Sequence, residues 1–179
     1  MNIPKQLPVL FLAFSLVVAC GGPDPAEEPT GRKVETTGKE AAALDMLPAE
    51  VLAAARSAKP DLVIEEAEYE LRDGREYYDV GGSLPDGSEM ELDMTKIDGV
   101  WTVVEFQRDI DLQTVPEAVR TALAGAMAAW SPDRIIESDQ GDGTVIYEFF
   151  GVDDAGQAVK IEVKWRDQVA EVLRDEWAH

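Results

Sequence analysis

Apolar and polar positions alternate with a period of two along three stretches of the chain, and a fourth stretch is more apolar throughout: 67–71, 77–84, 89–94 and 100–106. Since successive side chains of a strand point to opposite faces, this pattern predicts strands with one buried face. Asp-Gly pairs, which favour tight hairpins, separate the stretches at Asp73-Gly74, Asp86-Gly87 and Asp98-Gly99. The pattern therefore predicts an antiparallel sheet whose strands follow one another along the chain.

Two helices are predicted, one starting at Pro48 and one at Pro116. Proline suits the first position of a helix, where its missing N–H leaves no hydrogen bond unmade. Val51 and Ala55 recur about one turn apart, as the apolar stripe of a surface helix does. A second proline follows each helix and is expected to stop it, so the second helix should end at about Trp130.

The sequence also repeats itself at a spacing that suits a small domain. Residues 47–51 (LPAEV) are matched by 115–119 (VPEAV), and 59–65 (KPDLVIE) by 131–137 (SPDRIIE). The distance from residue 47 to residue 115 is longer than one solenoid repeat. We therefore expect an α+β fold of two tandem modules, each a helix packed on a four-stranded antiparallel sheet.

The start of the chain is typical of an export signal. Lys5 precedes an apolar run at 7–19 that is shorter than the roughly 20 residues of a membrane-spanning helix. The run ends in Val17-Val18-Ala19-Cys20, which resembles the lipobox of bacterial lipoproteins. The resemblance implies cleavage before Cys20, diacylglycerol on its sulfur and an acyl chain such as palmitate on its amine. It also implies the outer membrane if the host is Gram-negative, because Gly21 rather than Asp follows. An ordinary signal peptide with an incidental cysteine is the alternative.

The predicted organisation has four parts. Residues 1–19 are a signal peptide of the lipoprotein type, and 20–39 are a flexible linker rich in glycine and proline. Residues 40–112 form the first module and 113–179 the second.

The stretch Ile64–Asp93 contains Ile-Glu, Asp-Gly, Tyr-Tyr-Asp-Val, a second Asp-Gly and Glu-Met-Glu-Leu-Asp in that order. This pattern resembles the PepSY-like domains, and a tandem pair resembles the β-lactamase-inhibitor-protein architecture. The resemblance covers about residues 45–175. It implies a helix packed on an antiparallel sheet, and a binding or inhibitory role outside the cytoplasm, sometimes toward peptidases. The family has no shared catalytic residues to transfer.

Composition and charge exclude several classes of partner and site. The 36 acidic and 16 basic residues give a formal charge of −20, and removal of Lys5 with the signal peptide makes the mature chain more negative. Such a chain repels phosphates, so nucleic acid is excluded as a partner. One Cys and one His exclude a disulfide framework and a cysteine-rich zinc site, and disfavour Ser-His or Cys-His catalysis. No small-molecule cofactor is expected.

The contact surface is expected on the sheet face away from the helices, which strand parity makes strongly acidic in the first module. Its proposed members are Tyr77, Asp79, Glu89, Glu91, Asp93, Ile146, Phe150, Lys160 and Lys164. Three interpretations stay open for the acids: a solvated polar face, a docking face for a basic partner, or loose binding of divalent cations. Ile146 and Phe150 are either covered by another part of the chain or form the apolar centre of a protein contact.

The chain is not expected to be an enzyme. Acids on a flat sheet face should stay hydrated, with ordinary pKa values that suit acid catalysis poorly. Residues 138–143 resemble a calcium loop only slightly, since its first position lacks Asp and its twelfth is Phe149, so a hairpin turn is predicted. Trp177 is the tryptophan most expected to be exposed.

We therefore expect a lipid-anchored envelope protein whose modules bind a protein or peptide without catalysis. The alternatives are a structural or sensory envelope protein and an acidic cation-binding module.

Overall fold

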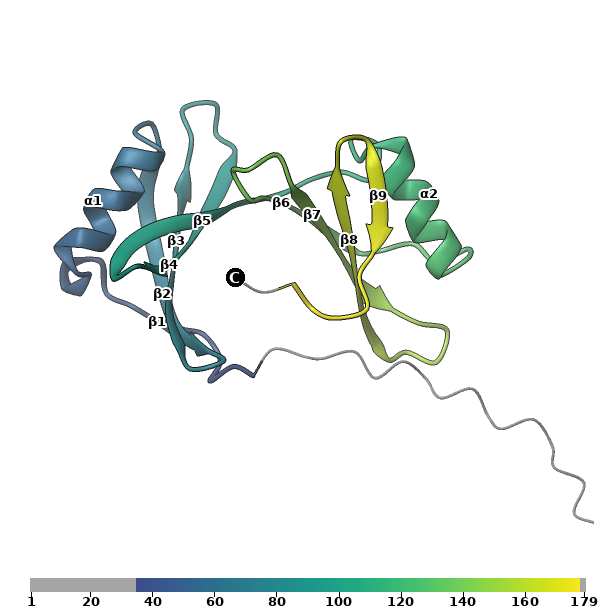
Figure 1. Cartoon of the computed structure of the whole chain (residues 1–179), viewed down its shortest axis with the longest axis horizontal. Helices are drawn as coiled ribbons and strands as arrows, with labels where there is room; N and C mark the ends of the chain where they lie inside the picture. The colour runs from purple at the N-terminus through teal and green to yellow at the C-terminus, as the bar shows by residue number, and fades with distance from the viewer. Residues whose placement is uncertain (1–34, 178–179) are drawn as a thin grey trace, which may run out of the picture. The chain divides into compact units, whose positions relative to one another are not determined.

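The computed structural model describes residues 35–177, and its main feature is one antiparallel sheet (Figure 1). Nine strands follow the order of the chain, each paired with the next. Their bounds are β1 Glu40–Ala41, β2 Val63–Arg72, β3 Arg75–Ser83, β4 Glu89–Ile97, β5 Val100–Asp109, β6 Arg134–Asp139, β7 Val145–Val152, β8 Ala158–Arg166 and β9 Val169–Val172. The predicted signal peptide and most of the predicted linker lie outside the described residues.

Two α-helices and one short 3-10 helix accompany the sheet within the described part of the chain. Their bounds are η1 Leu44–Met46, α1 Ala49–Ala58 and α2 Glu117–Ala126. Pro48 and Pro116 each immediately precede a helix instead of occupying its first position, so each helix begins one residue later than predicted. The second helix stops at Ala126, before the predicted end at Trp130. Neither is long and apolar enough to cross a membrane.

The predicted fold of two modules, each with its own four-stranded sheet, is wrong. Phe106 to Asp109 of β5 pair with Asp139 to Ile136 of β6, so the strands form one continuous sheet. Polar side chains reinforce this junction: Arg108 binds Glu137 at 2.6 Å and Arg134 binds Asp109 at 2.9 Å. Two separate sheets would have left β5 and β6 as additional unpaired edges, which favour association with other chains.

Both α-helices pack on the same face of this sheet. Cross-strand partners share a face, and Ala67, Val80, Leu92 and Phe106 are successive partners from β2 to β5. The next partner of Phe106, on β6, is Asp139, whose own row continues to Trp165 on β8. The first residues of this row pack in the cluster beside α1 and the last in the cluster beside α2. The opposite face, called here the helix-free face, carries the alternate residues.

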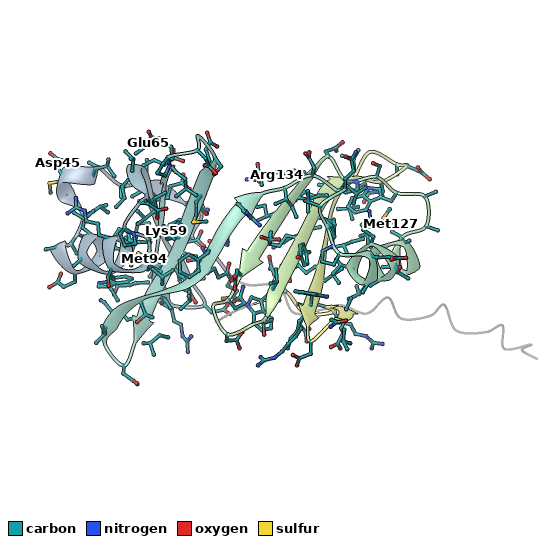
Figure 2. The ribbon with its side chains drawn as sticks, turned by 90° about the horizontal axis from the view of Figure 1, so that it is seen from above. Asp45, Lys59, Glu65, Met94, Met127 and Arg134 are labelled. Atoms are coloured by element: carbon teal, nitrogen blue, oxygen red, sulfur yellow. The ribbon has the colours of Figure 1, made fainter. Side chains whose placement is uncertain are left out.

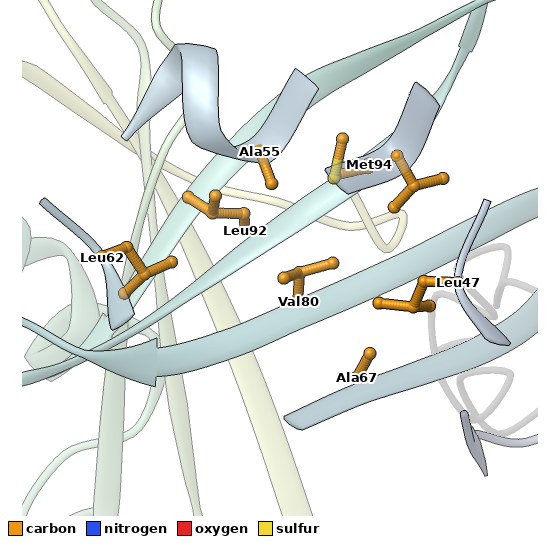
Figure 3. Packing of buried hydrophobic residues seen from close by; sticks show 8 residues of the cluster. Leu47, Ala55, Leu62, Ala67, Val80, Leu92 and Met94 are labelled. Carbon is orange, nitrogen blue, oxygen red and sulfur yellow. The ribbon is translucent and has the colours of Figure 1, made fainter. Parts of the chain in front are cut away.

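The first hydrophobic cluster lies between α1 and strands β2 to β4. Val51 and Ala55 of α1 are buried against a row formed by Ala67, Val80 and Leu92 (Figure 3). Fully burying one side chain of the size of Val51 or Leu92 contributes about 1.5–3 kcal/mol. The apolar stripe of the helix therefore holds it on the sheet.

The second cluster repeats this arrangement beside α2. Val119 and Leu123 of the helix are buried with Tyr147 and Phe149 of β7 and Val163 of β8. The two clusters share no residue, although the strands beneath them belong to one sheet.

The predicted tight turns are confirmed at two of the three Asp-Gly pairs as two-residue hairpins. Asp73 and Gly74 have φ of 47° and 78°, and Asp98 and Gly99 have φ of 50° and 81°. Two successive residues with positive φ suit the right-handed twist of the flanking strands. The remaining pair, Asp86-Gly87, lies in a longer turn between β3 and β4.

Candidate functional site

The structure places every residue of the predicted contact surface on the helix-free face. Gly81, Glu91, Gln107, Ser138 and Ile146 are successive cross-strand partners from β3 to β7, and Lys164 of β8 continues the row. The other members occupy alternate positions of these same strands: Tyr77 and Asp79 on β3, Glu89 and Asp93 on β4, Phe150 on β7 and Lys160 on β8.

A buried carboxylate pair lies at the centre of the first half of this face. Asp79 of β3 is directly opposite Asp93 of β4, and their exposed fractions are 2% and 0%. Arg72 binds both, with its Nη1 2.6 Å from Asp93 and its Nη2 3.1 Å from Asp79, and its Nε also donates to Glu70. Tyr77 lies under the guanidinium of Arg72, 4.4 Å from the ring centre. The guanidinium therefore holds the two carboxylates together.

The expectation that the acids stay hydrated is wrong at this pair, and the expectation of ordinary pKa values is wrong at Asp93. Burial, followed by the charge of Asp79, raises the pKa of Asp93 well above its usual value, although Arg72 opposes the shift. Burial also raises the pKa of Glu91. Within residues 35–177, Oδ1 of Asp93 has no hydrogen-bond partner. One arginine thus leaves part of the negative charge uncompensated.

Lys39 reaches Asp79, one member of this pair, from the edge of the sheet. Its Nζ lies 2.6 Å from Asp79, 3.2 Å from Glu91 and 3.6 Å from Glu68. Burial opposes the charge on this ammonium, but the attraction of Asp79 and Glu91 outweighs it and raises the pKa of Lys39. Lys39 therefore stays charged at neutral pH.

The second half of the face contains a similar group. Glu148 of β7 is opposite Glu162 of β8, and Lys160 binds each at 2.7 Å and Glu176 at 3.1 Å. Burial raises the pKa of Glu148 despite the nearby Lys160. The Phe150 ring lies 5.5 Å from the Lys160 ammonium. Each half thus buries a cross-strand carboxylate pair beside a cation.

The C-terminal segment covers part of this second half. The backbone N–H of Trp177 donates to Glu162 at 2.6 Å, and its indole N–H donates to Gln140 at 2.9 Å. The Lys164 ammonium lies 5.3 Å from the Trp177 ring centre. Trp177 is half-buried rather than exposed, and Ile146, which is opposite Lys164, is 1% exposed. Ile146 is therefore a covered residue and not an open apolar anchor.

Polar contacts continue across the junction of the two halves. Ser138 of β6 donates its hydroxyl to Glu105 of β5 at 2.6 Å, and both side chains are buried. Gln107 also donates to Glu105, and Gln140 donates to the Ser138 hydroxyl at 3.0 Å. The buried polar layer of the helix-free face is therefore continuous from β2 to the C-terminal segment. The loop at 140–144 is a hairpin connection, as predicted.

A groove of about 840 Å³ opens beside this layer, along β2 to β6. Gly81 and Gly82 contribute to its lining, since neither carries a side chain there. Arg134 and Glu65, both labelled in Figure 2, belong to its walls. The charged lining residues are six acids and three bases: Glu65, Glu66, Glu68, Glu89, Glu91, Asp109, Lys39, Arg108 and Arg134. The groove therefore favours a cationic occupant.

Sequence reasoning missed three residues that build this site. Arg72 shares the parity of Glu68 and Glu70, a signal that could have placed it among the acids. Lys39 fell in the predicted linker. Gly81 occupies one of the polar-parity positions of its strand, and a glycine inside a strand often marks a close approach or an open space, which is the signal that could have found it.

No group of three or more acidic, histidine or cysteine side chains in residues 35–177 is arranged to hold a metal ion. The buried acids instead contact Arg72, Lys39 and Lys160. Comparison of the chain with family models, with curated proteins and with solved structures gave no match.

Proposed function

We propose that the helix-free face binds a protein or peptide partner in the bacterial cell envelope and catalyses no reaction. The observation that supports this proposal best is the acidic groove of about 840 Å³ along β2 to β6. Its volume falls in the range of ligand-binding clefts, and its charge would steer a cationic partner toward it. The resemblance to PepSY-like modules, with their binding and inhibitory roles, points to the same function.

The raised pKa of Asp93 does not favour catalysis. Its carboxylate is 0% exposed and bound to Arg72, so a substrate would have to displace the arginine to reach it. A general acid needs a reacting atom within hydrogen-bond distance. The pair therefore suits a structural role beneath the binding surface.

The experiment compares capture from envelope extract by the wild-type chain and two charge-reversal variants. In the groove variant, Glu65→Lys and Glu89→Lys reverse two exposed charges of the lining. In the matched control, Glu50→Lys and Asp154→Lys reverse two exposed charges that do not line the groove. A partner of this surface is retained by the wild type and the control but lost by the groove variant, and it dissociates as salt rises. Equal capture by all three proteins contradicts the proposal.

We also propose that the chain reaches the envelope as a lipoprotein anchored through Cys20, which lies outside the described residues. The support is the lipobox-like sequence Val17-Val18-Ala19-Cys20 after a short apolar run. Mass spectrometry of the mature N-terminus should find diacylglycerol and an acyl chain on Cys20. An unmodified Cys20, or cleavage at another position, contradicts the anchor.

A further inference from the structure

Three carboxylates surround one ammonium group at the edge of the groove. Glu68 and Asp79 are cross-strand partners on β2 and β3, and Glu91 lies on β4 opposite Gly81. The Lys39 Nζ lies within 4 Å of all three. Glu68, Glu91 and Lys39 also line the groove, so this group is continuous with the open space beside it.

The carboxylates and the ammonium come from parts of the chain that are held very differently. Asp79 belongs to a central strand and is 2% exposed. Lys39 precedes β1, which has only two residues, Glu40 and Ala41, and both are exposed. The Lys39 side chain is itself 40% exposed. Backbone hydrogen bonds at Thr37 and Ala42 tie this segment to β2, but residues 35–41 are all exposed. Exposed edge segments open more readily than central strands, so the cation can leave while the carboxylates stay in place.

The corresponding cation of the second half has no such freedom. Lys160 belongs to β8, which pairs with β7 on one side and β9 on the other. Its backbone is therefore held beside Glu148 and Glu162 for as long as the sheet is folded. Only the first half combines a fixed group of carboxylates with an exchangeable cation.

The arrangement of the three carboxylates favours a lysine ammonium as the ligand. A lysine ammonium has three donors on a compact charge, which suits three oxygens at 2.6, 3.2 and 3.6 Å. Arg72 already supplies the planar donor that contacts both Asp79 and Asp93.

We propose that Glu68, Asp79 and Glu91 form a subsite for a lysine side chain of an extended partner segment bound in the groove, and that Lys39 occupies this subsite in the free protein. The inference rests on the proposed function and deepens it. At Gly81, opposite Glu91, the floor of the groove is covered only by the flexible Glu66 side chain, which can move aside where the backbone of such a segment would pass. Binding then exchanges one ammonium for another, so the buried charge of the subsite stays compensated.

The test measures the affinity of a short fluorescein-labelled peptide that alternates lysine with threonine, by fluorescence anisotropy with the purified full chain. Lys39→Ala removes the competing ammonium, so the peptide should bind about fivefold more tightly than to the wild type. Glu91→Gln should weaken binding about tenfold. Lys96→Ala, which removes an exposed ammonium that does not line the groove, is the matched control and should leave the affinity unchanged. The same peptide with acetylated lysines should not bind any of the proteins.

Unfolding midpoints in urea identify a variant that has lost its fold, and Glu68→Gln then replaces Glu91→Gln. Equal or weaker binding by Lys39→Ala overturns the subsite, as does equal binding of the acetylated peptide. Absence of peptide binding to every protein also overturns it. In each of these cases the broader function is judged separately, because the capture experiment changes Glu65 and Glu89 and leaves Lys39 and the three carboxylates around it unchanged.

Discussion

Asp93 of β4 lies directly opposite Asp79 of β3, and both carboxylates are buried on the helix-free face. Like charges at such a position destabilise a sheet unless a cation compensates them. Arg72 does so from β2 through hydrogen bonds to both residues. This three-residue contact makes the stability of the first half depend on pH and on one guanidinium.

The pH dependence follows from Asp93. Because its pKa in the folded protein is raised above 3.8, the folded state binds a proton more readily than the unfolded chain does. Its contribution to stability is therefore greatest at low pH and falls as pH rises through the raised pKa. Asp93→Asn does not ionise at this position, so its stability relative to wild type should increase between about pH 4 and pH 8. Urea denaturation across this range measures the difference.

A constant difference between Asp93→Asn and wild type over the whole range contradicts a raised pKa. Glu50→Gln removes an exposed charge near the start of α1 and shows the effect of charge alone.

Loss of Arg72 should be far more costly than loss of Asp93. Arg72→Met leaves Glu70, Asp79 and Asp93 buried without their guanidinium, which should lower the free energy of unfolding by about 3–5 kcal/mol at neutral pH. Combination with Asp93→Asn should recover part of this loss, because one of the buried charges is then absent. Strictly additive effects in urea denaturation would show that Arg72 and Asp93 are not coupled.

The two adjacent glycines of β3 should lose very different amounts of stability on the same substitution. A Cβ on Gly82 would lie 1.9 Å from the Val63 carbonyl oxygen, so Gly82→Ala forces the backbone apart and should cost about 2–4 kcal/mol. A Cβ on Gly81 meets only the Glu66 side chain, at 3.0 Å, which can move aside. Gly81→Ala should therefore cost less than about 1 kcal/mol. Thermal unfolding of Gly81→Ala and Gly82→Ala measures the two losses of stability. Equal losses would contradict the close approach of β2 at Gly82.

The junction of the sheet can be tested at Ser138. Ser138→Ala removes the hydroxyl that donates to Glu105 and leaves a buried carboxylate with one hydrogen bond fewer, at a cost of about 1–3 kcal/mol. Hydrogen exchange should show the amides of Phe106 to Asp109 exchanging faster in this variant. Thr114→Ala, at an exposed position, is the control. Unprotected amides at 106–109 in the wild type would contradict the pairing of β5 with β6.

Trp177 should stabilise the second half of the face. Trp177→Ala removes the hydrogen bond from its indole to Gln140 and the contact with Lys164, and should lower the free energy of unfolding by about 1–2 kcal/mol. Trp177→Phe keeps an aromatic ring but lacks the indole N–H, so its free energy of unfolding should fall by less than that of Trp177→Ala. Identical denaturation curves for all three proteins would show that the C-terminal segment does not hold to the sheet.

The sheet face on which each strand residue lies was predictable from the sequence, because it depends only on local alternation. Ala67, Tyr69 and Leu71 were predicted on one face and Glu68 and Glu70 on the other, and the pairing of β2 with β3 confirms this. The limits of α1 followed similarly from the prolines that flank it, to within one residue at its start.

The continuity of the sheet was not predictable in this way. Gln107, Arg108 and Asp109 show no apolar alternation, so the end of β5 read as the end of a module. Their partners on β6 lie about 30 residues away, beyond a helix, and the register is held by ion pairs such as Arg108 with Glu137. Such side-chain pairs leave no periodic signal in a single sequence.

Burial of the acids was missed for a related reason. Asp79 and Asp93 follow the polar parity of a solvated face, and the sequence alone does not show that Arg72, Lys39 and the neighbouring strands enclose them. The local pattern gives the face of a residue, whereas its exposure depends on residues from other strands.

The order of the strands has a kinetic consequence. Every strand of the sheet pairs with its neighbour in the sequence, and no described strand must wait for a distant one. The loops to be closed between partners are short except before β2 and β6, where a helix intervenes. Folding rates rise as the mean sequence separation of contacts falls. A chain that lengthens from its N-terminus during synthesis can therefore add one hairpin after another, without holding a long unpaired segment exposed.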